Sequence, residues 1–173
     1  MKNKFFNQLI RYALFIPLFT LSIFAANSIS AYAGELNMHA INVGRGDAIL
    51  IESNNHYMLV DSGTADASET ILEYLEKFNI PENKIDYIVS THPDEDHVGS
   101  FPFIFEKYDI GQVFYSPCPK ASGDYIDFIG AVKEEGCPFR TPIENETWQL
   151  GDATVQVVYD GSQGSTYNEC SIV

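Results

Sequence analysis

The sequence is poor in basic residues. Ten Lys and Arg residues stand against 24 Asp and Glu residues in 173 positions, which gives a net charge of −14. Three of the basic residues lie in the first 33 positions, which contain no acidic residue, so the remainder keeps seven and has a net charge of −17. Stable nucleic-acid binding depends on Lys and Arg side chains that displace counterions from phosphates. The composition therefore excludes a nucleic acid as a stable partner and leaves it only as a transient substrate.

Cysteine is also scarce. The chain has three cysteines, Cys118, Cys137 and Cys170, and an odd number leaves at least one unpaired within the chain. Cys118 follows a predicted strand and Cys137 follows the next predicted helix, so the two lie at opposite ends of a βα layer and a bond between them would be strained. The sequence therefore predicts no disulfide framework, and we expect all three to be small buried apolar side chains.

A long apolar run is missing after residue 33, and the run before it is short. The segment Tyr12–Ala26 follows a positively charged head, contains Pro17 and is shorter than the roughly 20 residues of a membrane-spanning helix. The small residues of Ala31–Ala33 form a signal-peptidase site. We therefore predict that residues 1–33 are a cleaved signal peptide and that 34–173 is a secreted domain without stable membrane association. The alternative is an uncleaved signal that anchors the protein in the membrane.

After residue 33 the apolar pattern alternates between strands and helices, which indicates one α/β domain. The first three strands are expected to form an antiparallel meander, because turn residues separate them. The chain stops inside an apolar β-type run, which leads us to expect a truncated domain. The predicted strands are Met38–Val43, Ala48–Glu52, Tyr57–Asp61, Ile85–Val89, Ile110–Tyr115, Trp148–Leu150, Ala153–Tyr159 and the beginning of one at Cys170–Val173, and the predicted helices are Ser68–Asn79, Ser100–Tyr108 and Gly123–Glu135.

Chemistry is concentrated in the segment Thr91–His97, which holds two imidazoles and three carboxylates directly after a predicted buried strand. These groups suit divalent ions such as Zn²⁺ or Mn²⁺. In an extended loop alternate side chains share a face, so His92, Asp94 and Asp96 converge and His97 turns to the other side. This geometry allows two ions, one held by His92 and Asp94 and the other by Asp96 and His97. The alternative is a solvated acidic turn with incidental histidines.

The segment His92–His97 resembles the H-x-H-x-D-H signature of the metallo-β-lactamase superfamily, with Asp94 where the second histidine usually stands. In this variant form it is similar to the hydrolase domain of ComEC-type competence proteins and their secreted stand-alone relatives. The resemblance covers nearly all of the chain after residue 35. Three further segments share it, namely Ile41–Ile51, Met58–Gly63 and Tyr167–Val173.

The resemblance implies an αββα sandwich, of which this chain has about the first half to two thirds. It implies a hydrolase with two divalent ions, Zn or Mn, and a metal-activated water that attacks a phosphodiester or ester bond in a small-molecule or polymer substrate. The metal ligands would be His92, Asp94, Asp96 and His97, and Asp96 would also be catalytic by orienting the attacking water. Asp61 and Asp47 would support the ligands, Asp61 by fixing an imidazole.

Two departures from the family pattern affect these expectations. The carboxylate of Asp94 adds negative charge to the first ion site, which favours Mn²⁺ over Zn²⁺. The family also uses a later aspartate and a later histidine as ligands, and neither occurs before Val173. The alternative function is therefore a catalytically inactive fragment or a binding module with the same fold.

Overall fold

The structure is a computed structural model that describes residues 34–173. The predicted signal peptide, residues 1–33, lies outside the described residues. Within the described part of the chain, none of the helices combines the length and the apolar character that a membrane-spanning segment requires.

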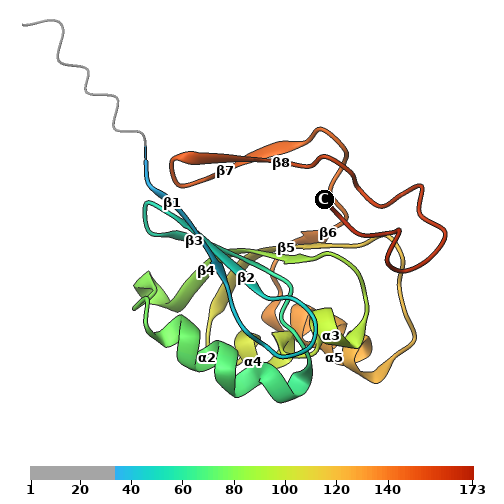
Figure 1. Cartoon of the computed structure of the whole chain (residues 1–173), viewed down its shortest axis with the longest axis horizontal. Helices are drawn as coiled ribbons and strands as arrows, with labels where there is room; N and C mark the ends of the chain where they lie inside the picture. Colours follow the sequence, from blue (N-terminus) through green and yellow to red (C-terminus); the bar gives the residue numbers. More distant parts are fainter. Residues whose placement is uncertain (1–33) are drawn as a thin grey trace, which may run out of the picture. The chain divides into compact units, whose positions relative to one another are not determined.

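A six-stranded mixed sheet forms the centre of the domain, with the strands in chain order (Figure 1). The first three strands pair antiparallel, as the predicted meander requires, and the next three continue the sheet in parallel. The predicted α/β class is therefore confirmed. The strands are β1 (Leu36–Ala40), β2 (Ile49–Ser53), β3 (His56–Val60), β4 (Lys84–Ser90), β5 (Asp109–Tyr115) and β6 (Phe139–Arg140).

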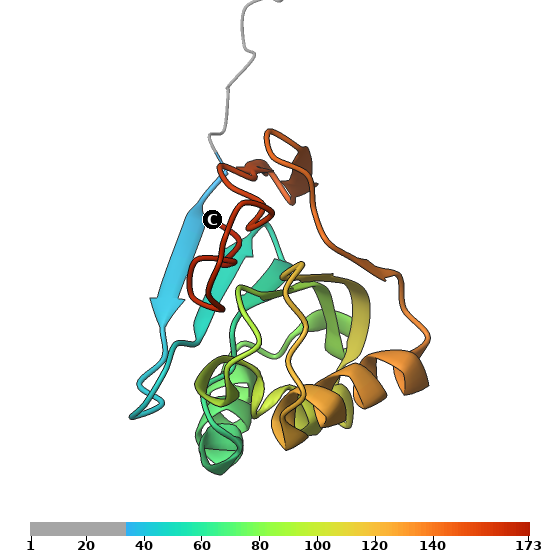
Figure 2. The ribbon, with the colours of Figure 1, turned by 90° about the vertical axis from the view of Figure 1, so that its right-hand side faces the viewer.

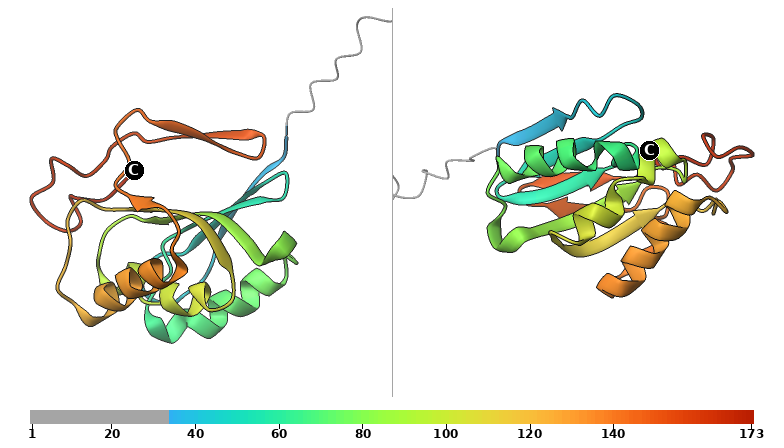
Figure 3. Two further views of the ribbon diagram at one scale, coloured as in Figure 1. Left: turned by 180° about the vertical axis from the view of Figure 1, so that it is seen from behind. Right: turned by 90° about the horizontal axis from the view of Figure 1, so that it is seen from below.

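The helices cover one face of this sheet (Figure 3). The bounds of α5, Gly123–Glu135, agree with the prediction, whereas α2, Ser68–Glu76, ends three residues early. The predicted helix Ser100–Tyr108 is shorter than expected, because α4 spans only Phe101–Phe105. A separate helical turn, α3, precedes it at Glu95–Val98, and two 3₁₀ turns, η1 (Ala65–Ala67) and η2 (Pro81–Asn83), flank α2.

The main core lies between the sheet and the helices. One row of paired residues crosses four strands, and every member of it is fully buried. The row consists of Leu50, Leu59, Ile88 and Val113. Because successive strand residues point to opposite faces, the alternation of apolar side chains places this row against the helices. Burial of these side chains fixes the strand register, and the register fixes where each strand ends.

The opposite face is covered by a two-stranded hairpin of β7 (Thr147–Leu150) and β8 (Ala153–Gln156) together with the carboxyl-terminal segment (Figure 2). A second apolar cluster joins them to the sheet, with Phe114 stacked on Trp148 at 4.4 Å between ring centroids. Residues 34–173 therefore supply one helical layer, the sheet and the hairpin of the expected αββα sandwich.

The predicted strand at Cys170–Val173 is wrong. This segment consists of turns and irregular backbone, although the backbone N–H of Ile172 donates to the carbonyl oxygen of Thr91 at 3.0 Å. The N–H of Val173 donates to the carbonyl oxygen of Tyr159 at 2.9 Å. The carboxyl-terminal segment therefore returns to the end of β4 without joining the sheet.

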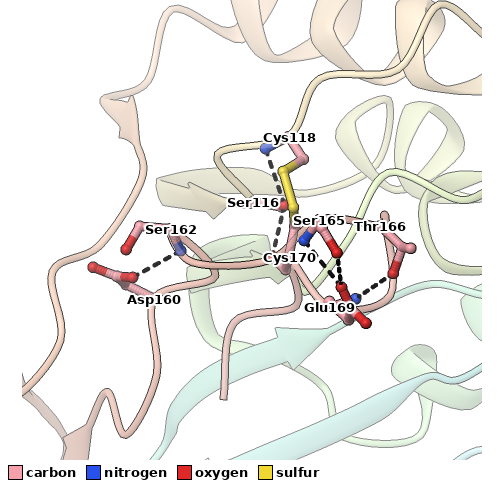
Figure 4. Close-up of a disulfide and its surroundings, with 8 residues drawn as sticks. All are labelled: Ser116, Cys118, Asp160, Ser162, Ser165, Thr166, Glu169 and Cys170. Atoms are coloured by element: carbon pink, nitrogen blue, oxygen red, sulfur yellow. Dashed lines mark hydrogen bonds between the residues drawn. A yellow bond between two sulfur atoms is a disulfide. The ribbon is translucent and has the colours of Figure 1, made fainter.

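The expectation for the cysteines is also wrong for two of the three. Cys118 and Cys170 form a disulfide, with 6.1 Å between their Cα atoms (Figure 4). Cys137 is free and partly buried. The bond arises because the carboxyl-terminal segment lies beside the loop after β5, a proximity that neither strand nor helix periodicity reveals.

Candidate metal centre

The candidate site lies where β3 and β4 end. Because these strands are parallel, their carboxyl ends meet at one edge of the sheet. Asp61 directly follows β3, and Thr91 and His92 follow β4. Asp61 has a left-handed backbone with φ of 56°, which is uncommon for a residue other than glycine. Its N–H donates to the carbonyl oxygen of Val89 at 2.9 Å, and this bond holds the turn against the end of β4.

The buried carboxylate of Asp61 accepts three hydrogen bonds from the segment that follows β4. The backbone N–H of Thr91 donates to Oδ1 at 2.8 Å, and the Thr91 hydroxyl donates to Oδ2 at 2.6 Å. Nδ1 of His97 lies 2.8 Å from Oδ2 and is the donor, because a carboxylate only accepts. With its proton on Nδ1, the neutral imidazole of His97 keeps a free lone pair on Nε2 for a metal ion.

The tautomer of His92 is set by the same carboxylate through Thr91. Nδ1 of His92 lies 3.0 Å from the Thr91 hydroxyl oxygen, whose own hydrogen is directed to Asp61. The hydroxyl therefore accepts from Nδ1–H, and Nε2 of His92 is left free to bind an ion. The two imidazole centroids are 3.8 Å apart. Asp61, His92 and His97 each place one possible ligand atom within 4.8 Å of the others.

The two imidazoles have opposite pKa shifts. Burial, followed by the charge on His97, lowers the pKa of His92 despite the nearby carboxylates. Burial also acts to lower the pKa of His97, but the hydrogen bond and charge of Asp61, with the charges of Asp96 and Asp47, raise it overall. The imidazole of His92 is therefore neutral over a wider pH range than that of His97, and the neutral imidazole is the form that binds a metal.

Asp94 lies beside His92. Its Oδ2 is 3.6 Å from Nε2 of His92, and its Oδ1 accepts a hydrogen bond from Nζ of Lys120 at 2.6 Å. The structure therefore brings together the two residues that were expected to hold the first ion. Both oxygens of Asp61 accept hydrogen bonds, and through them Asp61 orients the two imidazoles.

The expectation that Thr91–His97 is an extended loop is wrong. Asp94 has an extended backbone, but α3 begins at Glu95, so Asp96 and His97 lie on a helical turn. His97 reaches the cluster from that turn, whereas Asp96 lies outside the group of Asp61, His92 and His97. Strict alternation does not place Asp96 on the face of His92, because successive helical side chains are about 100° apart.

Asp96 contacts the turn between β1 and β2 instead. Its Oδ2 is 3.6 Å from Nε of Arg45, which also forms an ion pair with Glu95. Gly46 has a positive φ of 84°, and a Cβ there would overlap the carbonyl oxygen of Asp96. The exposed Asp47 accepts a backbone hydrogen bond from the N–H of Gly63 at 2.8 Å. This turn therefore packs on α3, and Asp47 supports the site through its backbone and its charge.

Sequence reasoning assigned no role to Thr91, Lys120 or Arg45. Lys120 follows β5, which is parallel to β4 and ends at the same edge of the sheet. That placement was a usable signal. The contacts of Thr91 and Arg45 depend on the left-handed turn at Asp61 and on the close approach at Gly46, which no local pattern indicates.

The donor set fits a divalent ion. Two free imidazole nitrogens beside a carboxylate match the preferences of Zn²⁺ and Mn²⁺, and His92 is almost fully buried. Each imidazole is oriented by a hydrogen bond at its other nitrogen, as is usual for metal-binding histidines. Residues 34–173 therefore contain a preformed group of side chains that could hold a metal.

The fold is similar to that of several solved structures. The chain is similar to the metallo-beta-lactamase SMB-1 in a complex with mercaptoacetic acid, with a TM-score of 0.57 and 20% identity over 79% of this chain and 53% of that chain. BJP-1, a subclass B3 metallo-beta-lactamase of Bradyrhizobium japonicum, has a TM-score of 0.56 and 19% identity over 79% of this chain and 52% of that chain. Rubredoxin oxygen:oxidoreductase from the anaerobe Desulfovibrio gigas has a TM-score of 0.53 and 21% identity over 82% of this chain and 36% of that chain.

At these identities the structural likeness shows the fold alone. The chain spans about half the length of the two metallo-beta-lactamases. No curated protein matches it. The family model described as the metallo-beta-lactamase superfamily matches residues 41–149, which is more than half of the sequence and includes Asp61, His92 and His97. The chain therefore belongs to the metallo-beta-lactamase superfamily.

Proposed function

We propose that the protein is a secreted metal-dependent hydrolase that uses two divalent ions, Zn or Mn, to cleave phosphodiester or ester bonds. The observation that carries this proposal is the cluster of Asp61, His92 and His97, whose possible ligand atoms lie within 4.8 Å of one another. Membership of the superfamily supports the same class of reaction.

The proposed roles of the side chains at the site are as follows. His92 and Asp94 would hold the first ion, and His97 and Asp96 the second. Asp61 would keep both imidazoles in the metal-binding tautomer, directly for His97 and through Thr91 for His92. When bound, the ions would supply Lewis acidity and would lower the pKa of a water toward about 7. Asp96, which lies next to Arg45, would orient that water.

The disulfide supports the proposed export. Disulfides persist in oxidising compartments and are rare in the cytosol. Cys118 and Cys170 are paired in the structure, and the predicted signal peptide would deliver the domain to such a compartment. Measurement of the mass of the exported protein tests this part, and we expect a mature chain that starts at Gly34. A retained amino terminus would support the membrane-anchored alternative instead.

Metal binding and hydrolysis are tested together. The chain is loaded with Mn²⁺ or Zn²⁺, its metal content is measured, and hydrolysis of bis(p-nitrophenyl) phosphate is followed for the unsubstituted protein, His92→Ala and Asp96→Ala. His56→Ala is the matched control, because His56 is exposed at the start of β3, away from the carboxyl edge of the sheet.

We expect both site variants to lose most of the activity and the His56 control to retain it. Equal rates in all the variants, or no retained metal in the unsubstituted protein, would contradict the proposed function. Retention of zinc alone after exposure to both metals would contradict the preference for manganese.

A metal-binding module without turnover is the second candidate. The observation that favours it is that Asp94 and Asp96 already face the cations Lys120 and Arg45. In that case the chain would retain a metal through His92 and His97, and no variant would change a hydrolysis rate that stays at the background level.

A further inference from the structure

Positive charge is rare in this domain, yet some of it is placed at the candidate site. Residues 34–173 have seven Lys and Arg side chains and a net charge of −17. Two of the seven contact the acidic residues that follow His92: Arg45 contacts Glu95 and Asp96, and Lys120 contacts Asp94. The acidic surface of the domain repels anions at long range. At the site, the positive charges of Arg45 and Lys120 make the electrostatic potential less negative than elsewhere on the domain.

Lys120 is held in a defined position next to the expected first ion. Its Nζ donates to Oδ1 of Asp94 at 2.6 Å, and the other oxygen of Asp94 is 3.6 Å from Nε2 of His92. On its other side, Nζ lies 5.1 Å from the ring centroid of Tyr167, within the range of a cation–π contact. The carboxylate of Asp94 therefore lies between Lys120 and Nε2 of His92, and about 30% of the Lys120 side chain remains exposed.

The disulfide joins the two segments that supply Lys120 and Tyr167. Cys118 precedes Lys120 by two residues, and Cys170 follows Tyr167 by three. The hydroxyl of Ser116 donates to the carbonyl oxygen of Cys170 at 2.9 Å and accepts from the N–H of Cys118 at 3.3 Å (Figure 4). We call residues 116–120 and 167–170 the stapled wall. Its covalent and hydrogen bonds hold the ammonium group and the aromatic ring on the same side of the site.

We propose that Lys120, supported by Tyr167, binds an anionic oxygen of the substrate, and that the substrate is a small phosphodiester. This inference rests on the proposed hydrolase function and narrows its substrate class. Once Asp94 shares its charge with an ion, the ammonium group is no longer fully neutralised and can pair with a phosphate oxygen. A neutral ester has no charge for Lys120 to recognise, and a long polyanion is repelled by the acidic surface outside the site.

The test compares two substrates and one binding probe on the Mn²⁺-loaded full chain. Bis(p-nitrophenyl) phosphate is the anionic substrate and p-nitrophenyl acetate the neutral one, and calorimetry measures the binding of dimethyl phosphate without turnover. The variants are Lys120→Gln and Lys120→Arg. Lys84→Gln is the matched control, because the exposed Lys84 begins β4 at the end of the strand opposite to His92.

For Lys120→Gln we expect a rise in the KM for the diester and a weakening of dimethyl phosphate binding, each of about tenfold or more, as for the loss of a charge-assisted hydrogen bond. In Lys120→Gln the kcat/KM for the neutral ester and the manganese content should stay within about twofold of the values of the unsubstituted protein. Lys120→Arg, which keeps the positive charge, should bind dimethyl phosphate more tightly than Lys120→Gln. Lys84→Gln should match the unsubstituted protein in every measurement.

Two outcomes overturn the inference. In the first, Lys120→Gln lowers the kcat/KM of both substrates equally and lowers the metal content, which makes Lys120 a structural partner of Asp94. In the second, dimethyl phosphate binds the unsubstituted protein and Lys120→Gln with the same affinity, or binds neither. Failure of the proposed function is separate: the unsubstituted protein then hydrolyses neither substrate, while dimethyl phosphate binding still reports on Lys120.

Discussion

Removal of the disulfide should cost a large part of the stability of this domain. Cys118 and Cys170 are 52 residues apart in the sequence. In the chain-entropy model, a cross-link over this separation lowers the entropy of the unfolded chain enough to stabilise the folded state by about 4 kcal/mol. Since single domains are stable by only about 5–15 kcal/mol, Cys118→Ser/Cys170→Ser should unfold far more easily than the oxidised protein.

Urea unfolding followed by tryptophan fluorescence measures this loss. At a slope of about 2 kcal/mol per molar urea, the midpoint should fall by about 2 M. Cys170 is buried, so its replacement by serine also buries a hydroxyl group. Reduction of the unsubstituted protein breaks the disulfide without that second change. Cys137→Ser is the control for loss of a free thiol. Midpoints of the oxidised and reduced proteins that agree within about 0.3 M would refute the reasoning, because the stapled wall would then be held by non-covalent contacts alone.

Three further predictions concern the candidate site and two glycines. Asp61→Asn should weaken Mn²⁺ binding by about 10–100-fold in calorimetry, because it replaces one of the two acceptor oxygens that orient the imidazoles by an NH2 donor. In the metal-free protein the pKa of His97 is raised above 6.5, chiefly by Asp61. The interaction of protonated His97 with Asp61 therefore stabilises the fold fully below pH 6.5, and this stabilisation is lost as the pH rises through the folded-state pKa. The difference in unfolding free energy between the unsubstituted protein and Asp61→Asn, measured in urea, should shrink toward alkaline pH. Gly46→Ala should destabilise the domain by more than about 1 kcal/mol, because the φ of Gly46 is positive and the new Cβ would overlap the backbone of Asp96. Gly130 is exposed and has open space around it in α5, so Gly130→Ala should stabilise the domain by about 0.5–1 kcal/mol. Thermal unfolding of both variants tests this difference.

The elements of the fold could be predicted where apolar periodicity is strong. The apolar residues of α5 recur at helical spacing, and its predicted bounds agree with the structure. The carboxyl edge of β4 was also predictable, because a continuous apolar run ends there and the ligand-type residues begin. The helical turn at Glu95 was missed because only its side-chain alternation was considered. The acidic residues Glu95 and Asp96 at its start are a local signal for a helix amino terminus.

The rest of the site depends on contacts between distant segments. Asp61 orients His97 across 36 residues, and Cys118 meets Cys170 across 52. Such contacts follow from how strands and loops pack, and local propensity does not encode them. The pairing of Lys120 with Asp94 belongs to the same class, although the parallel direction of β4 and β5 narrows the positions at which such a partner can lie.

The position of the ligand cluster along the chain bears on the order in which the molecule assembles. Asp61, His92 and His97 all come from one β3–α2–β4 unit and the turn after it, so the cluster lies within one continuous stretch of the chain. The disulfide, by contrast, joins Cys118 and Cys170, which both follow this stretch. During synthesis the residues of the cluster are therefore made before either cysteine of the disulfide.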